Sequence, residues 1–115
     1  MSGVLDRAKA HFQLQEIRSL EVPEWGDSPA APLVVFCKPV TLEQKAKLAR
    51  LAKNEASGLE LLVYALIELA LDAGGEKLFT LADKKALMSQ VDPDVVSRVA
   101  GWLLTPPDAE AIEKN

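Results

Sequence analysis

The chain has 115 residues, 49% of them hydrophobic and 26% charged, which is the length and balance of one globular domain rather than of a disordered segment. Thirteen Lys and Arg residues against seventeen Asp and Glu residues give a net charge of −4, which disfavours binding to the phosphates of nucleic acid. The longest apolar stretch, residues 61–67, is far shorter than the roughly 20 residues of a bilayer span, and the N-terminus lacks a signal-peptide pattern. We therefore expect one domain over residues 1–107, a flexible tail over residues 108–115, and neither a nucleic-acid nor a membrane partner.

The first forty residues predict a short helix followed by a β-hairpin. Apolar residues recur at helical spacing over residues 2–12, although so short a helix is marginal by itself. An imperfect period of two over residues 16–22 and a β-branched and aromatic run over residues 33–38 indicate two strands. Because proline-rich turn residues join them, we expect an antiparallel hairpin, and helices must cover one of its faces since a lone hairpin is not stable in water.

A basic helix is predicted over residues 41–53. Thr41 followed three residues later by Gln44 forms a capping-box pattern at its start. Its charge of +3 comes from one glutamate, Glu43, and four cations: Lys45, Lys47, Arg50 and Lys53.

An apolar helix is predicted over residues 57–73. Ser57 with Glu60 repeats the capping pattern, and the Gly74-Gly75 pair is a strong C-terminal stop. Its polar positions recur every four residues and so form one narrow stripe: Glu60, Tyr64, Glu68 and Asp72. We expect this helix to be covered on about three sides and to pack antiparallel to the basic helix, which compensates the acidic stripe.

Two shorter helices complete the predicted fold. Thr80 with Asp83 begins one over residues 80–89, and Asp92 followed by proline begins another over residues 93–104. The sequence therefore predicts an α+β, mainly α fold, in which an N-terminal hairpin packs on a bundle of about four helices.

No catalytic, metal or cofactor site is predicted. His11 lies in a terminal stretch with no nucleophile or carboxylate motif to work with it, so surface packing is favoured over general-base catalysis. Cys37 ends an apolar strand, where a thiol behaves as a small core hydrophobe rather than as a nucleophile. Residues 72–76 do not have the alternating oxygen ligands of a calcium loop. We expect a non-enzymatic protein.

The apolar surface of residues 59–71 and 95–103 exceeds what one thin basic helix can cover, so part of it is predicted to be an interface. Trp25, in a turn, and Trp102, on a helix, are the residue type most enriched at binding hot spots, although a helical Trp is more often core. The hypothesised partner-binding residues are Trp25, Leu62, Leu66, Val95, Val99, Trp102 and Leu103.

The order of these segments resembles the tail assembly chaperones of long-tailed bacteriophages and prophages over nearly the whole chain. Two segments are most similar to that family: the turn Val22-Pro23-Glu24-Trp25-Gly26, and the segment Gly75-Glu76-Lys77-Leu78-Phe79-Thr80 after the long helix. Residues 28–32 look like an insertion, because family members often join the two strands by a tighter turn.

The resemblance implies a chaperone that binds the tape measure protein, keeps it soluble in the cytoplasm of the bacterial host and yields to tail tube subunits. It also implies absence from the mature virion, and the family often has a second, longer form made by a frameshift. Opposite charges on the basic helix and on Glu60, Glu68 and Asp72 favour head-to-tail stacking of copies into rings or spirals. Two other interpretations stay open: a small structural virion component of connector or tail-terminator type, and a generic protein-binding adaptor.

Overall fold

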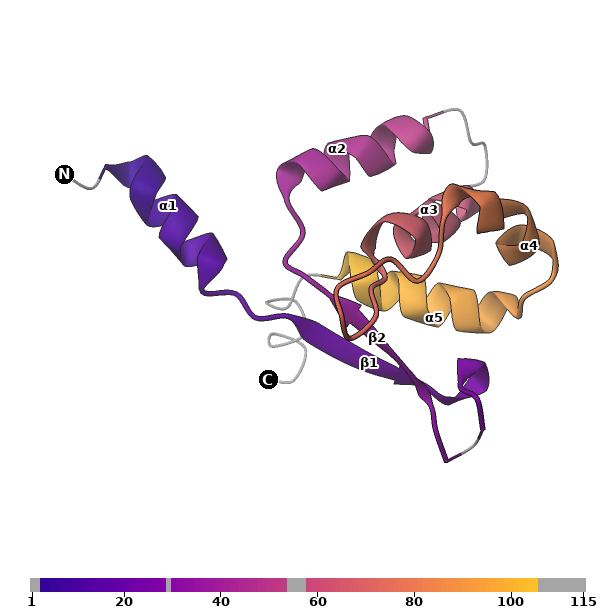
Figure 1. The fold of residues 1–115 in the computed structure, drawn as a ribbon. Helices are drawn as coiled ribbons and strands as arrows, with labels where there is room; N and C mark the ends of the chain where they lie inside the picture. Colours follow the sequence, from indigo (N-terminus) through magenta and orange to yellow (C-terminus); the bar gives the residue numbers. More distant parts are fainter. Residues whose placement is uncertain (1–2, 29, 54–57, 106–115) are drawn as a thin grey trace, which may run out of the picture.

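The computed structural model describes residues 3–28, 30–53 and 58–105. It is α+β and mainly helical with an N-terminal hairpin, so the predicted fold class is confirmed (Figure 1). The predicted tail over residues 108–115 and the predicted cap at Ser57 lie outside the described residues. The elements in chain order are α1 (Val4–Gln13), β1 (Arg18–Val22), the 3-10 turn η1 (Pro23–Trp25), β2 (Leu33–Cys37), α2 (Leu42–Leu51), α3 (Leu59–Leu69), the 3-10 turn η2 (Leu81–Asp83), α4 (Lys84–Ser89) and α5 (Pro93–Leu104).

The hairpin is antiparallel, as predicted, with a register that runs from Arg18 opposite Cys37 to Val22 opposite Leu33. Val22, Val35 and Cys37 are buried on the face that meets the helices. On its other edge β2 exchanges two backbone hydrogen bonds with Leu71, of 2.8 and 2.9 Å, so β1 is the outer strand.

Helix α3 is the centre of the molecule and contacts α2, α4 and α5 (Figure 1). Because its neighbours cover nearly every direction, six of its eleven residues are buried, namely Val63, Tyr64, Ala65, Leu66, Ile67 and Leu69. The start of α2 lies beside the end of α3, since Lys45 and Leu48 share a cavity wall with Leu69. The predicted antiparallel pairing of the basic and apolar helices is confirmed.

Three predicted capping patterns are present. The Gln44 backbone N–H donates to Thr41 Oγ1 at 3.1 Å, and the Thr41 backbone N–H donates to Gln44 Oε1 at 2.9 Å. Before η2 and α4 the backbone N–H of Thr80 donates to Asp83 at 2.8 Å. Asp92 caps α5, which spans the predicted residues 93–104, by accepting from the backbone N–H of Asp94 at 2.9 Å.

The apolar helix ends earlier than predicted, at Leu69 instead of residue 73. Leu71 pairs with β2 through its backbone, and this pairing replaces the hydrogen bonds that would continue the helix. The side chain of Asp72 then accepts from the backbone N–H groups of Gly74 and Glu76 at 2.8 and 2.9 Å. Gly75, with a φ of 85°, closes this turn, so the glycine pair is part of a turn and not a helix cap.

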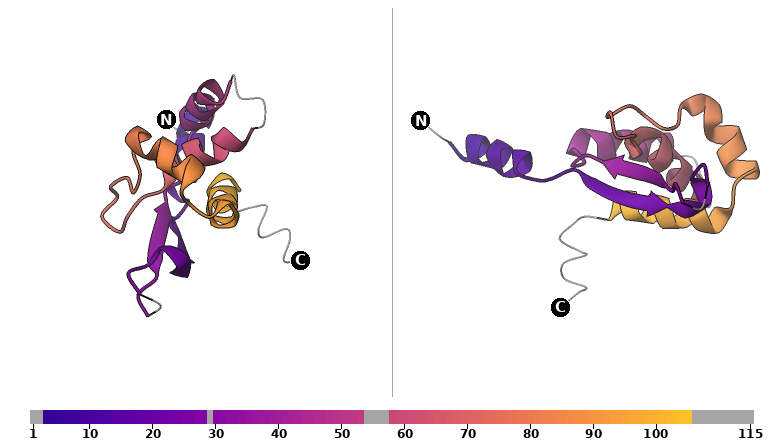
Figure 2. Two further views of the ribbon diagram at one scale, coloured as in Figure 1. Left: turned by 90° about the vertical axis from the view of Figure 1, so that its right-hand side faces the viewer. Right: turned by 60° about the horizontal axis from the view of Figure 1, so that its bottom comes forward.

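Helix α1 stands apart from the rest of the molecule, joined to β1 by a short extended segment (Figures 1 and 2). None of its residues is buried. The described chain therefore consists of a packed body and one projecting helix.

Candidate protein-binding surfaces

Most of the hypothesised partner-binding residues are in the core, which corrects the prediction. Leu66, Val95, Val99 and Leu103 are at most 4% exposed, because α3 and α5 pack their apolar faces against each other. Leu62, Trp25 and Trp102 are only partly buried, but they too pack against this core. The apolar surface of residues 59–71 and 95–103, part of which the sequence predicted to be an interface, is therefore buried mostly within the chain.

The two family-like segments meet in the structure. The rings of Trp25 and Phe79 lie edge to face with centroids 5.9 Å apart. Val22 has no exposed surface, and Leu78 packs on the core with Phe79. Trp25 thus pins the end of the hairpin to the segment after α3.

An ion pair and a tight turn also fix this end of the hairpin. Arg98 on α5 donates two hydrogen bonds to the carboxylate of Glu24, of 2.8 and 2.6 Å, and they lower the pKa of Glu24 to about 2. A Cβ on Gly26 would lie 2.3 Å from the Ala31 carbonyl oxygen, so only glycine fits there. Glu24 and Gly26 therefore have structural roles at this end of the hairpin.

Trp102 is covered by a cation. The guanidinium of Arg18 lies 4.8 Å from the centroid of the Trp102 ring and donates to the Trp102 carbonyl oxygen at 3.4 Å. This contact ties the start of β1 to the last turn of α5.

The acidic stripe is neutralised within the chain, which removes one half of the predicted stacking interaction. Glu68 lies 3.1 Å from Lys47 on α2 and 3.2 Å from Lys77. Burial by itself raises the pKa of Glu68, but hydrogen bonds from the two lysines outweigh it, so the pKa is lowered overall. Glu60 pairs with Lys84 at 2.8 Å, and the hydrogen bonds that this ammonium donates to Glu60 and Tyr64 raise its pKa.

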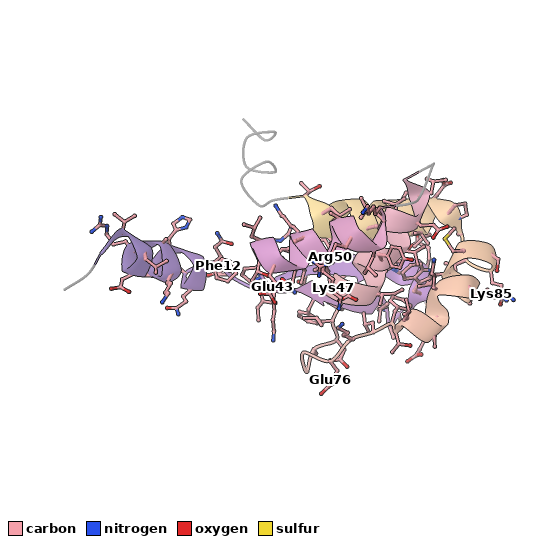
Figure 3. All side chains as sticks on the ribbon, turned by 90° about the horizontal axis from the view of Figure 1, so that it is seen from above. Phe12, Glu43, Lys47, Arg50, Glu76 and Lys85 are labelled. Carbon is pink, nitrogen blue, oxygen red and sulfur yellow. The ribbon has the colours of Figure 1, made fainter. Side chains whose placement is uncertain are left out.

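The remaining residues whose charges were predicted to stack between copies are not paired in this way. Asp72 lies in the turn after α3 rather than on its stripe. Lys45, Arg50 and Lys53 are exposed, and within residues 3–28, 30–53 and 58–105 they form no ion pair. These three cations thus stay available for contact with a second copy, and Figure 3 labels Arg50 on α2.

Exposed apolar side chains gather on α1 and on the segment that joins it to β1, which sequence reasoning missed; the other exposed large apolar side chains of the described residues, Leu42, Leu59, Leu81 and Met88, are spread over the body. Val4, Leu5, Ala8 and Phe12 fall within one sector of about 100° at 100° per residue, and Val4 and Leu5 are 74% and 67% exposed. Leu14 and Ile17, in the segment that follows, are exposed as well. The available signal is the helical spacing over residues 2–12, which predicts a helix but does not distinguish a core-facing stripe from an interface.

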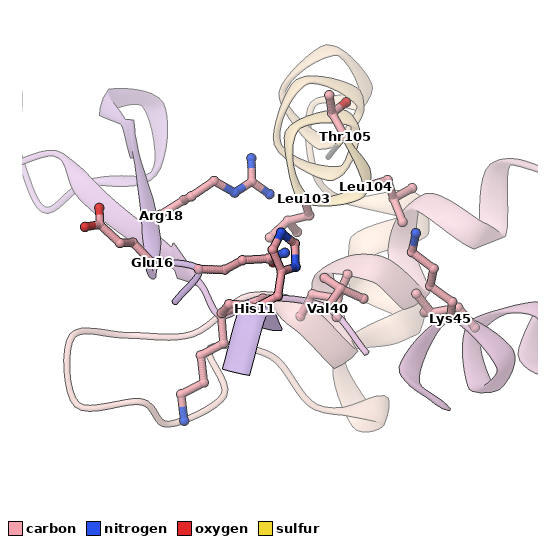
Figure 4. A pocket seen from close by; sticks show the side chains of 13 residues that line it. His11, Glu16, Arg18, Val40, Lys45, Leu103, Leu104 and Thr105 are labelled. Atoms are coloured by element: carbon pink, nitrogen blue, oxygen red, sulfur yellow. The ribbon is translucent and has the colours of Figure 1, made fainter. Parts of the chain in front are cut away.

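A groove of about 530 Å³ opens between the base of α1 and the body, and Figure 4 shows its lining. Its apolar wall is formed by side chains from the β2–α2 connection, α2, α3 and α5: Val40, Leu48, Leu69, Leu103 and Leu104. Residues with polar side chains complete the lining: His11, Gln15, Glu16, Arg18, Lys38 and Lys45, of which Lys38 directs its ammonium toward Gly75. This groove is the second candidate surface.

The residues considered for chemistry are not assembled into a reactive site. Cys37 is buried and burial raises the pKa of its thiol, which disfavours the nucleophilic thiolate. His11 lines the groove beside apolar side chains (Figure 4). In the described ranges no three His, Cys, Asp or Glu side chains cluster as metal ligands do. No helix in the part of the chain that the structure covers combines the length and apolarity of a membrane span.

Comparison with protein-family models, with curated proteins and with solved structures finds no match to this chain.

Proposed function

We propose that this protein is a non-enzymatic tail assembly chaperone that binds the tape measure protein of a long-tailed phage and keeps it soluble in the bacterial cytoplasm. Its binding to the tape measure protein precedes recruitment of tail tube subunits. The family resemblance of the sequence supports this proposal.

The observation that carries it is the unburied apolar face of α1. A ten-residue helix is marginal in water by itself, and α1 has no packing partner in the described chain although its apolar side chains share one face. Helical, apolar segments of a tape measure protein are suitable partners for such a face, because two amphipathic helices bury their stripes against each other. We therefore propose α1, rather than α3 and α5, as the binding surface.

Co-expression with the tape measure protein tests this function. We expect the wild-type chain to move the tape measure protein into the soluble fraction and Leu5→Ser to abolish this effect. Leu81→Ser is the matched control, because Leu81 is 63% exposed against 67% for Leu5 and lies on the body. Both variants should unfold at the wild-type temperature.

Two results would contradict the proposal. One is a tape measure protein that stays insoluble with the wild-type chain. The other is recovery of the chain from purified virions by mass spectrometry at a fixed copy number, which would identify a structural virion component.

A further inference from the structure

The outer side of β1 is an open edge of the sheet. Phe36 on β2 exchanges its two backbone hydrogen bonds with Leu71, so its backbone N–H and C=O groups point away from β1. Ser19 lies opposite Phe36 in the register, and the direction of the backbone groups alternates along a strand. The N–H and C=O groups of Ser19 and Glu21 therefore point away from β2, toward the outer edge.

In the described part of the chain, nothing pairs with these four backbone groups. Ser19 and Glu21 are both exposed, and β1 forms the lower margin of the hairpin in Figure 1. An open edge pairs with another strand unless charges, proline, a bulge or a covering segment block it. The register of β1 runs without a bulge over five residues, and Glu21 is the one charged side chain on its exposed face, so this edge is weakly protected.

The edge is complementary to a second copy of itself. In an antiparallel pair of β1 strands centred on Leu20, Ser19 of each copy lies opposite Glu21 of the other. Each of these pairs exchanges two backbone hydrogen bonds, which satisfies the outward N–H and C=O groups of both residues in both strands. The side chains match as well, because a serine hydroxyl donates to a carboxylate across the strands.

The neighbouring registers fit this edge less well. A register with Glu21 opposite Glu21 opposes two like charges and places Pro23, which has no N–H, opposite Ser19. A register with Ser19 opposite Ser19 places Glu21 opposite Ile17, which precedes the strand. The register centred on Leu20 satisfies the edge within the bounds of β1.

We propose that two copies of this chain pair through β1, antiparallel and centred on Leu20, to form a four-stranded sheet. The same surface is used on both copies, so the assembly closes at a dimer. Because α1 precedes β1, the two α1 helices leave from opposite ends of the joined sheet. The inference goes beyond the proposed function and does not depend on it, and it gives an extended partner two apolar helices to contact at once.

Sedimentation velocity of the full chain over about a hundredfold range of concentration tests the inference. We expect the wild type to show a monomer–dimer equilibrium. Ser19→Lys brings a cation opposite Glu21 of the other copy, whereas Ser19→Glu brings a like charge. The two variants should therefore shift the dissociation constant of the dimer by about three- to tenfold in opposite directions, the lysine variant being the tighter.

Ser97→Lys and Ser97→Glu are the matched controls, because Ser97 is an exposed serine on α5, outside the proposed interface. The same changes of net charge there should move the dissociation constant by less than about twofold. All four substitutions are at exposed positions and should leave the unfolding temperature nearly unchanged.

Proline at position 19 and hydrogen exchange test the backbone bonds themselves. Ser19→Pro removes an N–H that points away from β2, so the hairpin should remain while the dimer is lost. In the wild type, hydrogen exchange at the amides of Ser19 and Glu21 should slow as the concentration rises and the dimer forms.

Three results would overturn the inference. A chain that is monomeric throughout the concentration range leaves the edge to a strand of another protein. A dimer that the two charge variants at Ser19 shift in the same direction, or no more than the Ser97 variants do, pairs through a different surface. A dimer that Leu5→Ser dissociates pairs through α1.

Discussion

Replacing Leu66 with alanine removes a side chain from the middle of α3 that has no exposed surface in the folded chain. Three carbon groups are lost from a buried site, which at about 0.8 kcal/mol each is about 2.4 kcal/mol. The close-packed neighbours relax only in part, so the remaining cavity adds to this loss. We expect the free energy of unfolding to fall by about 3–5 kcal/mol, a large fraction of the roughly 5–15 kcal/mol typical of a domain.

Urea unfolding followed by far-UV circular dichroism measures this loss. Leu42→Ala is the matched control, because the same truncation at a side chain that is 83% exposed should change stability by less than about 0.5 kcal/mol. A loss below about 1 kcal/mol for Leu66→Ala, or equal losses for both variants, would refute the conclusion that α2, α4 and α5 seal α3 inside the body.

Three further predictions concern the turn, a helix and the ion pairs. Gly26→Ala should destabilise the chain by about 1–3 kcal/mol in thermal unfolding, because the new Cβ meets the Ala31 backbone. Gly101 lies inside α5 with nothing within 4 Å of an added Cβ, so Gly101→Ala should instead stabilise the chain by about 0.5–1 kcal/mol. If Gly101→Ala proved less stable than Gly26→Ala, the space around these glycines would not decide their effect. The stability that the Glu24–Arg98 pair supplies should be complete above pH 4.5 and should be lost as the pH falls toward 2, because folding lowers the pKa of Glu24 from 4.5 to about 2; a difference between wild type and Glu24→Gln that stays constant over this range speaks against it. Glu68→Gln should cost about 1 kcal/mol in low salt and less at about 1 M NaCl, and a cost independent of salt would show that the two lysine contacts do not contribute.

Local patterns in the sequence predicted the order and type of the main helices and strands and several of their ends, although the helix predicted over residues 80–89 is a 3-10 turn, Leu81–Asp83, followed by a helix over Lys84–Ser89. Side chains of Thr41, Gln44 and Asp92 cap helices through neighbours within three residues, so their hydrogen bonds are encoded by spacing alone. The end of α3 was not predictable in this way. It is decided by Phe36, more than thirty residues away, whose backbone pairs with Leu71.

The candidate site required the tertiary structure, because an apolar stripe has the same pattern whether it faces the core or a partner. Periodicity identified the apolar faces of α1, α3 and α5 alike, and only the packing of α3 against α5 shows that their stripes are satisfied while that of α1 is not. The same holds for charge: the sequence contains Glu68 and Lys47, but a carboxylate is neutralised by whichever cation folding brings within about 3 Å. The lining of the groove likewise combines His11, Leu48 and Leu103 from three separate helices. Composition and spacing thus determined which elements form, whereas distance in space, which a linear pattern does not contain, decided which surfaces are left for a partner.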